Sequence, residues 1–307
     1  MTRPLVSIVT PSFNQGKFLE ETMRSVLEQD YEPIEYIVVD GGSTDGSVDV
    51  IRRHEDRLAW WTSEPDGGQP QGLNKGFARS TGELMGFLNS DDTLLPGAVS
   101  QLVGELERDP RALAAYGDAV YVDERSGETR YGKSQVWGVG PMALAATGTV
   151  MQPASLWRRR AWELAGPFDE SYQVWFDVLF FLNMARFGPA SHVEEPLATY
   201  RIHQESKTAH ATGIPHTEEL MRVADEYFGG PDLPEELRPQ ARTLRALYYR
   251  RAAWGYYSSG DIARARRALL RSVPLRPRMS RKTMRLLART LTPEPIVRLR
   301  HRLAPRR

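Results

Sequence analysis

Short apolar segments alternate with amphipathic segments along the N-terminal part of this chain. Leu5–Thr10, Tyr36–Val39 and Leu84–Leu88 are rich in the apolar and β-branched residues that are typical of buried strands. Segments with helical spacing of apolar residues, such as Lys17–Leu27 and Gly97–Arg108, follow them. This alternation predicts βαβ units and therefore an α/β fold with a mostly parallel central sheet flanked by helices.

Acidic residues stand where two of these predicted strands end. Asp40 follows Tyr36–Val39, and Asn89-Ser90-Asp91-Asp92 follows Leu84–Leu88. Because such sheets bind ligands outside the carboxyl ends of their strands, we expect these acids to meet in one crevice. Adjacent carboxylates repel each other and are costly to bury, and a cation that faces an anionic ligand offsets this cost. The pair thus indicates either a divalent-metal site or a solvated turn closed by Pro96-Gly97.

The composition narrows the classes of protein that fit. The 307 residues include no cysteine, which excludes disulfides and thiolate metal ligands. No segment approaches the ~18 apolar residues of a membrane span, and the N-terminal segment has the pattern of a strand instead of a signal peptide. We therefore expect a cytoplasmic protein.

The net charge of +1 conceals a strong asymmetry along the chain. Residues 1–220 contain 19 Lys and Arg against 32 Asp and Glu, whereas residues 221–307 contain 21 Lys and Arg against 7 Asp and Glu. A basic segment of this kind is expected to bind an anionic partner, such as a membrane surface or a nucleic acid, or to pack on the acidic part of its own chain.

The basic segment has a helical pattern throughout. Leu244–Ser258 and Ile262–Val273 are predicted helices, and Asp261 between them is a suitable N-cap. Small residues along both segments favour a tight helical hairpin. The sequence therefore predicts two parts, an α/β domain over residues 1–213 and a basic α-helical extension over residues 214–307.

Five motifs occur in one order along the first part: VSIVTPSFN, VVDGGSTDGS, SEPDGG, LNKGFARSTGE and LNSDD. In this order and spacing they resemble the family 2 glycosyltransferases, which have the GT-A fold, over roughly residues 4–205. The resemblance implies a Rossmann-like sheet and an inverting enzyme. Such an enzyme moves a sugar from a nucleotide diphosphate sugar to an acceptor hydroxyl.

The resemblance places the nucleotide at the ends of the first two strands. Backbone and small side chains at Pro11, Ser12, Phe13 and Asn14 would line the base and the ribose. Asp40 would accept a hydrogen bond from a base N–H or a ribose hydroxyl, unless it serves only as a turn or N-cap residue. The two glycines after Asp40 allow a close approach of backbone and ligand.

Asn89, Ser90 and Asp91 correspond to the metal-binding Asp-x-Asp motif of the family, with Asn in the first position. Asn89 and Ser90 are then expected to lie against the nucleotide sugar. Asp91 is the leading metal ligand, and Asp92 is a second ligand or a supporting residue. Mn²⁺ or Mg²⁺ suits such oxygen ligands and would stabilise the departing nucleoside diphosphate.

The segment from Ser63 to Gly76 resembles the SEPDxG and NKG motifs of the family. Asp66, Asn74 and Lys75 are therefore candidates for contact with the diphosphate sugar. Lys75 on a solvated helix face is the alternative. Gln71 stands where many relatives carry an acidic residue, so no role is predicted for it.

Asp177 aligns with the catalytic base of the family, which opens a helix after a Phe-Asp-Glu stretch. Phe176 replaces the first acid of the family's Glu-Asp-Tyr-Asp-Leu-Trp motif and Leu179 replaces the later one. Apolar surroundings would raise the pKa of Asp177 and make it a better base. The alternative is a helix-start residue. Asp169 and Glu170 are expected in turn and capping roles.

The segment from Tyr200 to Lys207 resembles the family's Arg-x-His-x-x-Ser motif. His203 would ligate the metal or contact the diphosphate, and Arg201 and Lys207 would neutralise phosphate charge. A structural role for His203 is the alternative. Some aromatic residues could stack on an acceptor sugar or belong to the core. These are Trp137, Trp175 and Phe176.

Together these features predict a metal-dependent inverting glycosyltransferase. UDP-sugar is the favoured donor, with dTDP- or GDP-sugar open, and the acceptor is a glycan or a lipid-linked sugar in polysaccharide or cell-surface glycan biosynthesis. The basic tail is then expected at the inner membrane face, and no nucleic acid partner is expected. A degenerate nucleotide-binding module and a nucleotidyltransferase are the alternatives. The second is disfavoured because nucleotidyltransferases usually hold the triphosphate with a Gly-rich basic loop after the first strand, whereas PSFNQGK has one Gly and one Lys.

Overall fold

A computed structural model describes residues 3–145, 150–206 and 213–291 of the chain. The chain divides into two compact units, Met1–Ser206 and Lys207–Arg307. The sequence predicted the boundary slightly later, after residue 213. The first unit contains a sheet and helices, and every described element of the second unit is helical.

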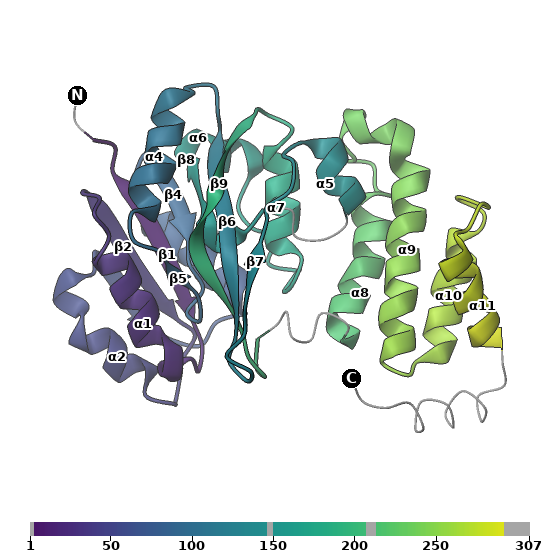
Figure 1. The fold of residues 1–307 in the computed structure, drawn as a ribbon, viewed down its shortest axis with the longest axis horizontal. Coiled ribbons are helices and arrows are strands. Elements are labelled where there is room, and N and C mark those ends of the chain that lie inside the picture. Colours follow the sequence, from purple (N-terminus) through teal and green to yellow (C-terminus); the bar gives the residue numbers. More distant parts are fainter. Residues whose placement is uncertain (1–2, 146–149, 207–212, 292–307) are drawn as a thin grey trace. The chain divides into compact units, whose positions relative to one another are not determined.

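A mixed sheet forms the centre of the first unit (Figure 1). Its strands are β1 (Val6–Ser12), β2 (Ile34–Asp40), β3 (Trp60–Ser63), β4 (Leu84–Phe87), β5 (Thr93–Leu94), β6 (Ala114–Asp123), β7 (Thr129–Gly132), β8 (Ser155–Arg158) and β9 (Ala190–Ile202). The strand order is β3-β2-β1-β4-β8-β6-β9-β5, and β7 pairs with β6. The predicted α/β class with a central sheet is therefore confirmed.

Parallel pairing is confined to part of this sheet. β1 is parallel to β2 and β4, β2 is parallel to β3, and β6 is parallel to β9. In contrast, β8 is antiparallel to both β4 and β6, and β5 and β7 also join in antiparallel pairs. The predicted βαβ pattern thus describes β1 to β4, whereas the second half of the sheet is mixed.

Helices cover both faces of the parallel part. The helices of the first unit are α1 (Gly16–Leu27), α2 (Ser47–Arg53), α3 (Gln69–Arg79), α4 (Ala98–Arg108), α5 (Val139–Ala145), α6 (Arg159–Ala165) and α7 (Phe176–Met184). Gly76 of α3 lies against Val9 and Val39, whereas α1 and α4 share a core with Ile8 on the opposite face of β1. Successive side chains of β1 therefore point to opposite faces and pack against a layer of helices on each face.

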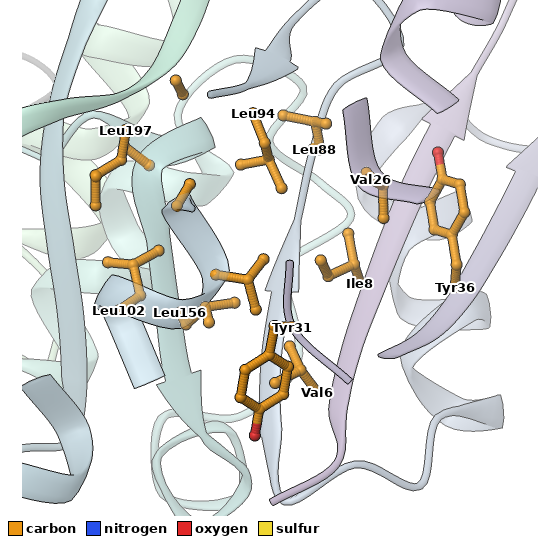
Figure 2. Packing of buried hydrophobic residues seen from close by; sticks show 14 of the residues in the cluster. Val6, Ile8, Val26, Tyr31, Tyr36, Leu88, Leu94, Leu102, Leu156 and Leu197 are labelled. Carbon is orange, nitrogen blue, oxygen red and sulfur yellow. The ribbon is translucent and has the colours of Figure 1, made fainter. Parts of the chain in front are cut away.

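Figure 2 shows the core on the α1 and α4 side of the sheet, where Ile8 and Tyr36 from the strands lie near Val26 of α1. Leu102 of α4 and Leu156 of β8 complete this buried cluster. These side chains lie far apart in the sequence. Their packing therefore holds together strands that are distant from one another along the chain. The carboxyl ends of β1, β2 and β4 consequently lie at one edge.

Two short strands were not predicted. β5 has two residues and exists because Thr93 and Leu94 pair with Thr199 and Ala198 of β9. β7 is mostly exposed and pairs with β6, so it lacks the apolar pattern of a buried strand. β9 extends from Ala190 to Ile202 because it pairs with β6 along its length. Non-local pairing decides all three cases.

The second unit contains α8 (Ile214–Arg222), α9 (Ala241–Ser258), α10 (Ile262–Ser272) and α11 (Arg281–Leu291). The predicted hairpin of α9 and α10 is confirmed, and the Asp261 side chain accepts a hydrogen bond from the Arg264 amide at 2.9 Å, as an N-cap does. In the part of the chain that the structure describes, every helix is too short or too polar to cross a bilayer.

Two helical glycines provide a test of the packing of α3 on the sheet. A Cβ at Gly76 would lie 2.5 Å from Val9 Cγ1, whereas a Cβ at Gly104 in α4 meets nothing within 4 Å. We expect Gly76→Ala to destabilise the protein by about 1–3 kcal/mol through overpacking. Gly104→Ala, the matched control, should stabilise it by about 0.5–1 kcal/mol because alanine favours helix. Urea unfolding measures both, and equal effects would contradict this packing.

Candidate active site

The ends of β1 and β2 lie side by side, because Ser12 is the register partner of Asp40. The Asp40 carboxylate is buried and accepts hydrogen bonds from the Ser43 amide at 2.8 Å and the Ser63 hydroxyl at 2.7 Å. It also accepts bonds from the Gly42 amide and the Ser43 hydroxyl. Asp40 thus organises the turn after β2, and its contact with a nucleotide stays a prediction.

The segment Pro11–Asn14 presents polar and aromatic groups at this edge. Ser12 Oγ is buried and has no hydrogen-bond partner among the described residues, which is unusual for a buried hydroxyl. The Phe13 side chain is 61% exposed next to it. Asn14 takes a positive φ of 51° and its Oδ1 accepts a hydrogen bond from the Thr44 amide at 2.9 Å. The loop is therefore held to the turn after β2.

Asp91 and His203 lie together although 112 positions separate them. Asp91 Oδ2 is 3.0 Å from His203 Nε2. His203 is buried, and its ring packs on Phe18 of α1 with the centroids 4.7 Å apart. The end of β4 and the segment after β9 thus bring two of the three predicted metal ligands into contact.

Asp92, the third predicted ligand, points to different partners. Its Oδ1 accepts a hydrogen bond from the Arg201 amide at 2.9 Å, and its Oδ2 accepts one from Asn89 Nδ2 at 3.3 Å. Burial, and then the charge of Asp91, raises the pKa of Asp92 well above its ordinary value. The geometry therefore favours the supporting role that the sequence left open for Asp92.

The donor atoms at this point suit a hard divalent cation only in part. Over the described ranges, no group of three His, Asp or Glu side chains is arranged to hold a metal ion. Asp91 and His203 offer one carboxylate and one imidazole. Mn²⁺ accepts such a pair when phosphate oxygens or waters supply the remaining positions.

Asn89 lies in a side-chain network, which gives a reason for Asn at the first position of the motif. Its Oδ1 accepts a hydrogen bond from Gln69 at 2.6 Å, and its Nδ2 donates to Gln152 at 3.2 Å as well as to Asp92. An Asp here would lose both donated bonds and place a second charge against buried Asp92. Ser90 beside it is buried.

Arg201 connects the acidic segment to α1. Its Nε donates to the Asp91 carbonyl at 3.0 Å, its Nη2 donates to Glu21 at 2.6 Å, and its guanidinium lies 4.9 Å from the centre of the Phe18 ring. Phe18 and Glu21 were missed by the sequence analysis, since both belong to the helical pattern of α1. Lys207 lies outside the described residues.

The predicted diphosphate candidates on and before α3 have partners within the protein. Asp66 Oδ1 accepts a hydrogen bond from the Gly68 amide at 2.8 Å, at the N-terminus of α3. Lys75 forms an ion pair with Glu64 at 2.8 Å. Asn74 donates to the Phe168 carbonyl at 2.9 Å and accepts from the Phe168 amide at 3.0 Å. Their contact with a donor stays a prediction.

Asp177 lies in the first turn of α7, where a negative charge interacts favourably with the helix dipole. Phe176 before it is buried and packs on Phe168 and Phe87, with centroids 5.1 and 6.2 Å apart. Phe176 therefore belongs to the core and anchors the start of α7. Because Asn74 holds Phe168, a chain of contacts from α3 positions Asp177. The predicted rise of its pKa stays a prediction.

The other two aromatic candidates, Trp137 and Trp175, also pack within the protein. Trp175 is buried at the start of α7, and Trp137 stacks on Tyr116 with the centroids 5.9 Å apart.

Asp169 accepts hydrogen bonds from Ser171 within its turn, as predicted for a turn residue. Glu170 instead accepts a hydrogen bond from Asn74 at 3.0 Å, so it joins its loop to α3.

A polar hollow of about 320 Å³ lies beside His203. Gln15 Oε1 is buried in this region without a hydrogen-bond partner among the described residues, and Lys17 pairs with Glu124 across the hollow. The Asp91–His203 pair thus adjoins space that a polar ligand or water can occupy. The residues around the hollow come from three segments: Asn14, Gln15, Lys17, Phe18, Glu124, Arg125, His203, Gln204 and Glu205.

Solved structures with bound nucleotide sugars share this fold. The structure of Staphylococcus aureus TarS 1–349 in complex with UDP-GlcNAc matches with a TM-score of 0.63 and 16% identity, over 97% of this chain and 87% of that one. The mannosyltransferase PcManGT from Pyrobaculum calidifontis, in complex with GDP-Man and Mn²⁺, matches with a TM-score of 0.58 and 20% identity, over 94% and 79%. The predicted GT-A fold is therefore confirmed.

Sequence comparison identifies the family. The chain belongs to glycosyl transferase family 2, whose model matches residues 7–165, and it is therefore an enzyme of the glycosyltransferase class. It is 25% identical over 285 residues to an uncharacterized glycosyltransferase of Nostoc sp., a match that spans 84% of this chain and 87% of the relative. It is also 39% identical over 93 residues to the putative teichuronic acid biosynthesis glycosyltransferase TuaG of Bacillus subtilis, over 29% and 37%. The family match ends before Asp177 and His203.

Asn74 offers a test of how the loop before α7 is held. We expect Asn74→Ala to lower the free energy of unfolding by about 1–3 kcal/mol, because both backbone groups of Phe168 lose their partner. Lys75→Ala on the same helix should change it by less than about 1 kcal/mol, since its ion pair is at the surface. Thermal and urea unfolding compare the two. Equal effects would exclude the anchoring role of Asn74.

Proposed function

We propose that this enzyme is a metal-dependent inverting glycosyltransferase that moves a sugar from a nucleotide diphosphate sugar to an acceptor hydroxyl. The observation that carries the proposal is the Asp91–His203 pair, 3.0 Å apart at the carboxyl edge of the sheet. That edge also holds Ser12 and Asp40, the residues proposed for the nucleotide. A diphosphate that extends from the nucleotide toward the pair would join these two groups of residues.

UDP-sugar is the proposed donor class. The TarS complex with UDP-GlcNAc supports UDP, and the PcManGT complex with GDP-Man keeps GDP-sugar as the second candidate. The exposed Phe13 ring suits a ligand with a flat base. We assign contacts with the nucleotide sugar to the following residues, as proposals: Pro11, Ser12, Phe13, Asn14, Asp40, Asp66, Asn74, Lys75, Asn89, Ser90, Arg201 and Lys207.

Asp91 and His203 would hold Mn²⁺ or Mg²⁺, and the PcManGT complex with Mn²⁺ supports the first. The cation would neutralise charge on the departing nucleoside diphosphate. Asp92 supports the site by holding the Arg201 amide, and Arg201 in turn holds the Asp91 carbonyl. These contacts keep the Asp91 carboxylate directed toward His203.

Asp177 is the proposed general base, which accepts the proton of the attacking hydroxyl during a single displacement. Its carboxylate lies at the N-terminus of a helix that Phe176 anchors in the aromatic core. Such anchoring limits the movement of the carboxylate, and a fixed base transfers protons more effectively. Inversion follows if the hydroxyl attacks from the side opposite the departing diphosphate.

We further propose a growing glycan or a lipid-linked sugar as the acceptor, in polysaccharide or cell-surface glycan biosynthesis. The similarity to TuaG, a putative teichuronic acid biosynthesis enzyme, supports this class of product. The transferase domain would comprise residues 1–213, and residues 214–307 would form the basic helical extension.

Substitution of Asp177 tests the base. We expect Asp177→Asn to lower turnover by roughly 10²–10⁴-fold, because the amide cannot accept the proton, while the Kd for UDP stays within about threefold of wild type. Donor hydrolysis and transfer, followed by release of UDP, measure turnover, and calorimetry measures binding. Asp169→Asn is the matched control and should keep its activity. Wild type without turnover but with intact nucleotide binding would instead identify a degenerate module.

Removal of the metal, or of Asp91, tests the donor site. UDP at a hundredfold excess over its Kd should stabilise the protein by ~2.7 kcal/mol, and we expect this gain to require Mn²⁺ or Mg²⁺. Asp91→Asn should abolish the metal-dependent part of the thermal shift and leave the melting temperature of the free protein within about 2 °C. A shift of equal size in EDTA would refute metal-assisted binding.

A further inference from the structure

The most concentrated charge of this protein lies in its second unit. Residues 262–291 contain ten Lys and Arg and no Asp or Glu. Some of these cations stabilise the unit itself, because Arg264 pairs with Glu218 at 2.7 Å and Arg271 pairs with Asp225 at 2.6 Å. Arg266 also serves the unit, because its Nε donates a hydrogen bond to the Thr290 carbonyl at 2.9 Å.

α11 carries a cationic stripe. Arg281, Arg285 and Arg289 are exposed and follow one another at intervals of four residues, so they lie along one side of the helix. Lys282 lies beside them, with its ammonium 4.8 Å from the centre of the Trp254 ring. Within residues 213–291, no carboxylate forms an ion pair with any of the three arginines. The stripe therefore has no internal counter-charge among the described residues.

The same helix exposes an apolar stripe next to the cations. Met284 is 49% exposed and Leu291 is 62% exposed, and the two lie seven residues apart, which is two helical turns. A different side of α11 faces the core of the unit, and its buried residues are Thr283, Leu286 and Thr290. α11 thus has one buried side and, on its exposed surface, adjacent cationic and apolar stripes.

We propose that this face of α11, which consists of Arg281, Met284, Arg285, Arg289 and Leu291, binds an anionic lipid bilayer. Cations next to exposed apolar side chains are the pattern of helices that lie in the membrane interface. The arginines would contact phosphate headgroups, and Met284 and Leu291 would enter the acyl boundary. The inference does not rest on the proposed sugar transfer, and its test measures no enzymatic activity.

Other anionic occupants fit this face less well. Single-stranded nucleic acid binding relies on aromatic stacking, and α11 has no aromatic residue. Phosphate contacts alone would leave the exposed Met284 and Leu291 unused. The following segment of the same chain, residues 292–307, contains five Arg and one acidic residue, so it offers the face no complementary charge. A lipid surface matches both stripes.

Vesicle flotation of the full chain tests the proposal. We expect binding to vesicles that contain 30% phosphatidylglycerol in phosphatidylcholine, no binding to pure phosphatidylcholine, and loss of binding as salt rises from about 0.05 to 0.5 M. The triple variant R281Q/R285Q/R289Q should bind roughly a hundredfold more weakly, because each cation near the surface contributes about fivefold. R52Q/R108Q/R111Q removes the same charge from exposed sites of the first unit and should bind like wild type.

A second variant separates a membrane from other polyanions. M284Q/L291Q removes the apolar stripe without changing the charge, so it should weaken vesicle binding at least tenfold but leave retention on a dextran sulfate column unchanged within about twofold. Circular dichroism melting confirms that both variants fold. Undiminished vesicle binding by the arginine variant would overturn the proposal. Unchanged vesicle binding by M284Q/L291Q would also overturn it, in favour of a general polyanion surface.

Discussion

The parallel pairing of β1 with β2 and β4 is the constraint on which the rest of the first unit depends. Parallel strands end at the same edge, so the segments after the three strands must share one region of space. The buried cluster around Ile8 and Tyr36 sets the register of that edge. The segments that carry Ser12, Asp40 and Asp91 consequently leave the sheet at that edge, although a long stretch of chain separates each from the next.

A second set of contacts comes from the mixed half of the sheet, which places residues of β9 and the following segment at the same edge. β9 is parallel to β6 and pairs with β5, and this pairing places Arg201 and His203 against the acidic segment after β4. Arg201 binds the Asp91 carbonyl and Glu21 of α1, so three elements are held by one guanidinium. The protein thereby stabilises two adjacent carboxylates through different partners: Asp92 through backbone and amide groups, and Asp91 through an imidazole.

Much of the first unit could be predicted because its strands and helices carry strong local patterns. β1, β2, β4, α1 and α4 follow the expected periodicities, and the motif order pointed to the confirmed family. β5 and β7 could not be predicted in this way, since a two-residue strand and an exposed strand exist only through pairing with β9 and β6. The first five elements could be predicted because local periodicity in the sequence specifies them. β5 and β7 could not, because hydrogen bonds to distant strands specify them.

The sequence by itself determined the α/β class, the family and the identity of the acidic groups at the strand ends, because these depend on residue type and short-range spacing. Only the tertiary structure decided how those groups are divided among partners. It paired Asp91 with His203, turned Asp92 toward Arg201, and placed Phe176 in the aromatic core. Each of these outcomes depends on which distant side chain lies within about 3–6 Å, the range of a hydrogen bond or a ring contact, and packing alone sets such distances.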